Sequence, residues 1–170
     1  IVPADYNQTK AATMAIADYE GLVYLRFGRP KVPNFTSTEE PFVIGKAQIL
    51  TTGIDVTIIA NGHLVWKALE AAEQLAEEGI KAEVINMHTV KPLDEEAILA
   101  SLAKTGCVVT AEEHQRNGGL GDSVAQVLAM YKPAPQEYVA VNDSFGESGT
   151  PEQLLEKYGL NATSIVNAAY

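Results

Sequence analysis

Residues 55–88 show the clearest ordering of apolar and polar positions in the chain. Residues 55–60 form a β-branched apolar run, short enough for a buried strand, and the Asn-Gly pair at 61–62 marks a tight turn. Gly79 should end the following helix in a left-handed cap, and 82–87 is a second apolar run. The helix carries one apolar face, formed by Val65, Ala68, Leu69, Ala72, Leu75 and Ala76. The unit predicts two parallel strands with a right-handed helical crossover.

The same alternation continues to the C-terminus. Further strands are predicted at 42–50, 107–111 and 138–141, and helices at 95–104, 122–130, 151–158 and 161–170. Because a three-residue turn joins the strand at 42–50 to the strand at 55–60, that pair is expected to be antiparallel and at an edge. The fold class is therefore α/β, an open, mostly parallel five-stranded sheet with helices on both faces.

The N-terminal 33 residues follow a separate pattern. Asp5 and Gln8 form a capping-box pair for a helix that runs to about residue 18, and 22–27 reads as a strand. We expect Ile1-Val2 to be the end of a strand that begins upstream, in a longer chain. The domains are then 1–33, the terminal helix–strand piece of a second α/β domain, the proline-rich linker 34–41, and 42–170.

Composition excludes several classes of function. The net charge of −10 makes nucleic acid or an anionic membrane an unfavourable general partner. The single cysteine, Cys107, rules out an internal disulfide framework and suits a reducing cytoplasm, and its apolar neighbours predict a buried, unreactive thiol. No stretch approaches the ~18 continuous apolar residues of a membrane span.

Polar side chains gather where the predicted strands end, which is where open α/β sheets bind ligands. All three histidines follow strands, and imidazole can act as acid, base or ligand. A minor site is therefore a candidate, formed by His63, His88, Glu113 and His114. No pair has the helical spacing of a metal-binding motif, so no metal site is predicted. The simpler interpretation is that exposed loops carry polar residues without further role.

A glycine-rich loop at 118–121 precedes a predicted helix. Backbone N–H groups at such a helix start could bind phosphate. The spacing fits neither the dinucleotide fingerprint nor the Walker motif, so a tight strand-to-helix turn is favoured.

Arg29 lies in a short cationic stretch, with Arg26 and Lys31, in an otherwise acidic chain. A guanidinium group can donate two parallel hydrogen bonds to phosphate oxygens. A solvated loop arginine explains the residue equally well at this level.

The chain resembles the C-terminal section of transketolase, of the bacterial and archaeal type that is encoded as two subunits. The resemblance covers nearly all residues, and the order of its motifs is more specific than any single one. The matching stretches are IVPAD at 1–5, GRP at 28–30, DVTIIA at 55–60, KPLD at 91–94, TAEEH at 110–114, GGLG at 118–121 and FGESGT at 145–150.

This resemblance implies that 1–33 ends the pyrimidine-binding domain and that 42–170 is the transketolase C-terminal domain. It implies a transferase of the pentose phosphate pathway that moves a two-carbon ketol unit between sugar phosphates with thiamine diphosphate and magnesium. Arg29 matches the arginine that contacts the substrate phosphate. No catalytic residue carries over to this chain, so it should be inactive and bind no cofactor alone. The implied partners are the N-terminal domains or subunit and, in a homodimer, a second copy.

Two alternatives remain open from the residues. One is the β subunit of a 2-oxo acid dehydrogenase, or deoxyxylulose-phosphate synthase, both of which share this domain. The other is a stand-alone ligand-binding or regulatory α/β module that uses the loop at 112–121.

Overall fold

The computed structural model describes residues 1–170 and is built around one five-stranded sheet. The strands are β1 (Gln48–Thr51), β2 (Val56–Ala60), β3 (Ala82–Asn86), β4 (Val108–Gln115) and β5 (Gln136–Val141), in the order β1-β3-β2-β4-β5. The helices are α1 (Tyr6–Ala17), α2 (Leu64–Glu77), α3 (Glu95–Thr105), α4 (Leu120–Tyr131), α5 (Pro151–Lys157) and α6 (Ala162–Ala169). None of them combines the length and apolar character that a membrane span requires.

The sheet is parallel except at one edge. β2 pairs in parallel with β3 and with β4, and β4 pairs in parallel with β5. This confirms the predicted fold class and the parallel strand–helix–strand unit at its centre. In this order β2 has β3 on one side and β4 on the other. The connection from β2 leads to β3, and the connection from β4 leads the opposite way, to β5. The adjacent strands β2 and β4 therefore flank a topological switch point.

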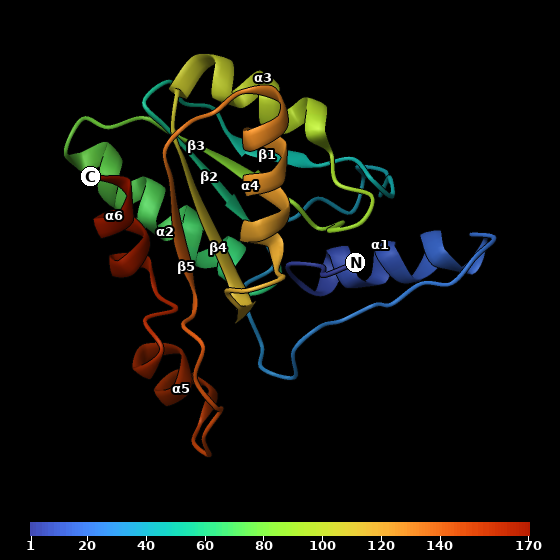
Figure 1. Ribbon diagram of the computed structural model, residues 1–170. Helices are drawn as coiled ribbons and strands as arrows, with labels where there is room; N and C mark the ends of the chain where they lie inside the picture. The colour runs from blue at the N-terminus through green and yellow to red at the C-terminus, as the bar shows by residue number, and fades with distance from the viewer.

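Helices cover both faces of the sheet, with α3 and α4 on one side and α2 and α6 on the other (Figure 1). Alternate residues of β2 supply the two cores, since Ile58 packs under α2 and Ile59 packs in the cluster with α3 and α4. Both side chains are fully buried. α5 and the loop before it extend from the body of the domain (Figure 1), and no α5 residue is buried.

The first strand differs from its prediction in length and in partner. Only residues 48–51 form β1, and this strand is antiparallel to β3 rather than to β2. The predicted antiparallel edge is correct, but the chain crosses the start of β3 before it reaches β2. Gly53 makes this crossing, where a Cβ would lie 2.3 Å from the carbonyl carbon of Ala82. Only glycine allows two backbones to approach so closely.

The predicted strand at 22–27 is not formed. The segment is extended, and its only strand-like contact is with Ile1, whose N–H group donates to Tyr24 O (2.8 Å) and whose carbonyl accepts from Arg26 N (2.9 Å). This is the hydrogen-bond pattern of parallel strands. Leu22 and Tyr24 are exposed, so their apolar side chains have no sheet to pack against within this chain.

Side-chain and glycine caps define the ends of three helices. Asp94 accepts from Ala97 N (3.3 Å) at the start of α3, and Asn161 accepts from Ser164 N (2.9 Å) at the start of α6. Thr150 forms a full capping box at α5, and Gly106 ends α3 in the left-handed conformation (φ 75°). These residues fix the ends of the helices and therefore the positions of the loops between them.

Candidate functional site

The N-terminal segment covers the carboxyl ends of the parallel strands. Val2 joins two of them through its backbone, donating to His88 O after β3 (2.7 Å) and accepting from Gly62 N after β2 (3.2 Å). The amide of Asn86, the last residue of β3, donates to Gln8 Oε1 on α1 (3.0 Å). The sheet edge at which open α/β domains bind ligands is therefore largely occupied by residues of the same chain.

Asp5 anchors this segment. Its carboxylate accepts from Gln8 N (2.9 Å), as the capping-box pattern predicted, and also from Phe35 N (2.8 Å) and Thr36 N (2.8 Å). Burial alone would raise the pKa of Asp5, but these hydrogen bonds outweigh it and lower the pKa from its ordinary value. One ionised side chain thus fixes both the start of α1 and the beginning of the linker.

Arg29 is exposed and makes no hydrogen bond or ion pair within the chain. It lines a cavity of about 510 Å³ together with Lys31, Asn34 and His63. Tyr6 and Thr9 of α1 and the N-cap residue Asp5 complete the polar part of the wall, and the carboxylate of Asp5 is already bound by the N–H groups of Gln8, Phe35 and Thr36. An unpaired guanidinium beside a lysine, in a chain of net charge −10, makes this cavity a candidate site for an anion.

The four candidates for a minor site do not form one cluster. His63, after β2, and Glu113, in β4, lie together, with 3.4 Å between Nδ1 and Oε2. His114 is turned away, and its Nδ1 lies 2.7 Å from the carbonyl oxygen of Gln115. His88 lies elsewhere, in the wall of a different cavity. Of the four residues the structure brings together only His63 and Glu113, because strand ends that share an edge still point their side chains to different places.

His88 is a buried, neutral side chain. Its Nδ1 lies 3.0 Å from Thr89 Oγ1, and its ring packs against Phe42 with 4.2 Å between ring centroids. Burial lowers the pKa of His88 to about 4, because the charged form would lose its hydration. This environment suits a packing role rather than acid–base chemistry at neutral pH.

The glycine-rich loop leads into α4, whose N-terminus is already occupied by a carboxylate. Glu112 accepts from Leu120 N (2.8 Å) and Gly121 N (2.9 Å), the N–H groups that would bind a phosphate. Gly119 makes room for it, since a Cβ there would lie 2.4 Å from Glu112 Oε2. Burial raises the pKa of Glu112, and the two hydrogen bonds oppose that shift. The favoured interpretation as a turn is correct, and Glu112 is the residue that sequence reasoning missed.

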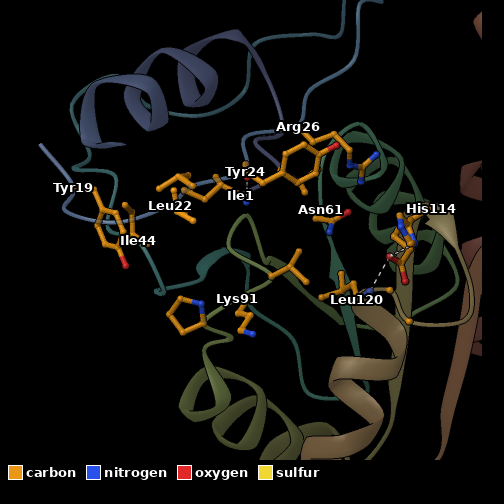
Figure 2. Close-up of a pocket in the computed structure, with 17 residues that line it drawn as sticks. Ile1, Tyr19, Leu22, Tyr24, Arg26, Ile44, Asn61, Lys91, His114 and Leu120 are labelled. Atoms are coloured by element: carbon orange, nitrogen blue, oxygen red, sulfur yellow. Dashed lines mark hydrogen bonds and ion pairs between the residues drawn. The ribbon is translucent and has the colours of Figure 1, made fainter. Parts of the chain in front are cut away.

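A second cavity, of about 610 Å³, lies between residues 19–26 and the strand ends, beside Ile1 and Val2. Figure 2 shows Tyr19, Leu22 and Ile44 at one end of it and Asn61, His114 and Leu120 at the other. The apolar end is formed mainly by residues whose predicted strand has no sheet here.

Cys107 is half-buried, not fully buried as predicted. Its Sγ lies 3.5 Å from the carbonyl oxygen of Asp55, and burial raises its pKa. A raised pKa keeps the thiol protonated, which agrees with an unreactive side chain.

The residues of this chain do not form a site for a magnesium diphosphate group. No three His, Cys, Asp or Glu side chains converge as metal ligands would. The one glycine-rich helix start is filled by Glu112, whose charge would repel a diphosphate. Such a cofactor would have to be held by groups outside these residues.

The chain is an open α/β domain whose strand ends are largely covered by its own N-terminal segment. The family model "Transketolase, C-terminal domain" matches residues 45–165. The chain belongs to the transketolase C-terminal domain family.

Relatives with curated names support this assignment. The chain is 49% identical to the 6-deoxy-6-sulfo-D-fructose transketolase subunit SqwH of Clostridium sp. (strain MSTE9), over 99% of the chain and 52% of that protein. It is 45% identical to a putative transketolase C-terminal section of Methanocaldococcus jannaschii, covering 97% of the chain and 52% of that protein. The chain thus spans about half the length of these relatives.

A solved structure agrees in fold. The chain superposes on one described as "Split gene transketolase, inactive beta4 tetramer" with a TM-score of 0.96 and 50% identity, covering 99% of this chain and 55% of that one. A 1-deoxy-D-xylulose-5-phosphate synthase of Heliobacterium modesticaldum is less similar, at 36% identity over 99% of the chain and 27% of that protein. The transketolase interpretation is therefore favoured over the related alternatives.

Proposed function

We propose that this chain forms the C-terminal part of a transketolase-type enzyme that transfers a two-carbon ketol unit between sugar phosphates. The family match and the transketolase subunits among its relatives support the proposal. Thiamine diphosphate supplies the carbanion chemistry in such an enzyme. Because the residues here do not fit that cofactor, it and its magnesium ion are held by another part of the enzyme. The 170 residues alone are expected to be inactive.

Residues 1–33 are inferred to be the end of the pyrimidine-binding domain, with 34–41 as linker and 42–170 as the C-terminal domain. The parallel hydrogen bonds between Ile1 and the extended segment at 24–26 support this division. The exposed apolar side chains of Leu22 and Tyr24 would then pack inside that domain.

The proposed partners are the N-terminal subunit of the enzyme and further copies of this chain. The word "subunit" in the name of the Clostridium relative supports the first, and the solved neighbour, described as a tetramer, supports the second. A homodimer is one such assembly, and the tetramer shows that related chains form larger ones. We place the enzyme in the cytoplasm because a single free cysteine suits a reducing compartment.

Arg29 is the residue that we assign to substrate binding. It has no partner within the chain, and it faces a cavity with Lys31 as a second cation. The guanidinium can donate two parallel hydrogen bonds to a phosphate. The named substrate of the Clostridium relative carries a sulfonate instead. The proposed substrate class is therefore a ketose with an oxyanion at the end remote from the carbonyl group.

The test is Arg29→Ala in the complete enzyme that contains this chain. The KM for sugar phosphates should rise about 10-fold or more, through the loss of one or two charge-assisted hydrogen bonds. Lys10→Ala, which removes an exposed cation from α1, is the matched control and should leave KM unchanged. An unchanged KM for Arg29→Ala would reject the role.

The absence of cofactor binding has its own test. Calorimetric titration of the 170-residue chain with thiamine diphosphate and magnesium should give no binding at micromolar concentrations. Micromolar affinity would contradict the proposal that the cofactor is held elsewhere.

A further inference from the structure

His63 occupies the N-cap position of α2 but does not cap it. Its backbone is already helical (φ −60°, ψ −26°), and its side chain makes no capping hydrogen bond. The imidazole is instead turned toward the N-terminal segment, and its side chain is only 12% exposed. The ring therefore contacts residues outside its own helix.

That contact is with Gly28, the residue immediately before Arg29. A Cβ on Gly28 would lie 2.1 Å from His63 Cε1 and 2.7 Å from Nε2, so the loop backbone rests directly on the imidazole. No side chain could be accommodated without moving either the ring or the loop. The ring of His63 thus supports the backbone of the loop that carries Arg29.

Glu113, on the neighbouring strand β4, contacts both the ring of His63 and the start of the loop. Its Oε2 lies 3.4 Å from His63 Nδ1, and its backbone carbonyl accepts a hydrogen bond from Arg26 Nη1 (3.0 Å). Arg26 lies two residues before Gly28, so the same strand end fixes the loop and the ring beneath it. His63 comes from the end of β2 and Glu113 from β4, which are the two strands that flank the switch point of the sheet.

We propose that His63 and Glu113 are positioning residues for anion binding by Arg29. The inference rests on the proposed function, since it assumes that Arg29 binds the oxyanion of the substrate. It assigns to the C-terminal domain a part in substrate binding, exerted through the loop at 27–31 rather than through direct contact. His63 contacts the loop directly, and Glu113 contacts His63 through its carboxylate and Arg26 through its backbone carbonyl.

The experiment uses the complete enzyme that contains this chain. His63→Ala and Glu113→Ala should each raise the KM for a sugar phosphate about fivefold, with kcat changed less than twofold, because ground-state and transition-state binding are weakened equally. His63→Asn, whose Nδ2 can replace Nδ1, should restore most of the affinity. With a sugar sulfonate as substrate, the variants should rank in the same order of KM. The substitutions change the position of the loop, which binds either oxyanion.

Two glycines provide a matched pair. Gly28→Ala should raise KM because the new methyl group displaces the loop from His63, whereas Gly146→Ala adds a methyl group into open space and should have no effect. This pair carries the test if His63→Ala fails to fold. Equal KM values for Gly28→Ala and wild type would overturn the proposal.

Hydrogen exchange of the chain measures the local order of the loop directly, independently of substrate affinity. The amide of Arg26, which donates to Ile1 O (2.9 Å) at the start of this loop, should exchange at least threefold faster in Glu113→Ala, while those of the buried strand β2 stay unchanged. Unchanged exchange at Arg26 would reject the positioning role. If Arg29→Ala leaves KM unaltered, the proposed function fails; if it raises KM but His63→Ala and Glu113→Ala do not, only the present inference fails.

Discussion

The side-chain amide of Asn86 donates a hydrogen bond to Oε1 of Gln8, joining the end of β3 to the first helix across 78 residues of sequence. Both residues are buried, and the same Gln8 oxygen accepts a second hydrogen bond from Ala4 N (2.8 Å). The N-terminal segment is therefore bonded into the polar interior of the sheet edge rather than laid loosely over it.

Gln8→Ala should lower the free energy of unfolding by about 1–3 kcal/mol, because it leaves the buried Asn86 amide and the Ala4 N–H group without an acceptor. Urea denaturation measures the change. Lys10→Ala, exposed on the same helix, should shift stability by less than about 0.5 kcal/mol. Equal effects of the two substitutions would show that the contact with β3 contributes little.

Glu112→Ala should destabilise the chain by about 2 kcal/mol, since the N–H groups of Leu120 and Gly121 lose their acceptor at a buried helix start. Adding formate, which can place a carboxylate in the vacated position, should restore part of that loss. Glu137→Ala, at an exposed position of β5, is the control and should show neither effect. Thermal unfolding with and without formate distinguishes the two cases, and a Glu112→Ala variant that is insensitive to formate would argue against an anion site.

His88 should make stability depend on pH in a defined direction. Its pKa falls from 6.5 to about 4 on folding, so between these values the unfolded chain binds more protons than the folded chain. Stability contributed by neutral His88 is therefore complete above pH 6.5 and is lost as the pH falls toward 4, by about 3 kcal/mol in total. The causes are burial first and the N-terminal amino group second, with Asp94 opposing them.

The measurement is the difference in unfolding free energy between wild type and His88→Gln across pH 4–7. The other titrating groups are the same in both proteins, so their contributions to the pH dependence cancel. The remaining difference in unfolding free energy comes from His88. The wild type should lose stability relative to the variant as the pH is lowered. A constant difference would mean that His88 keeps an ordinary pKa in the folded chain.

The sequence predicted those parts of the fold whose signals are local. The central unit at 55–88 was correct because apolar periodicity, a turn and a left-handed glycine act within a few residues of one another. The strand at 22–27 was wrong because its residues have the right composition but only Ile1 as a neighbour. Strand formation depends on partners, which composition does not reveal.

The candidate site was predicted in its residues but not in its pairing. Arg29, His63 and Glu113 were each identified, yet nothing in the sequence indicates that His63 lies 3.4 Å from Glu113 while His88 packs on Phe42. The role of Glu112 was missed, because nothing local marks a glutamate within β4 as the acceptor for N–H groups eight and nine residues further along the chain. Glu83 was also hidden within an apolar run, where its buried carboxylate pairs with Lys104.

The carboxylate at the start of α4 has a consequence for how this domain responds to its surroundings. An anion that is covalently part of the chain has a fixed local concentration, so its occupancy does not vary with solutes in the medium. A helix N-terminus that binds free phosphate gains and loses its anion as the phosphate concentration changes. At α4 the carboxylate of Glu112 keeps this position filled. The start of α4 therefore keeps the same hydrogen bonds whatever anions surround the protein.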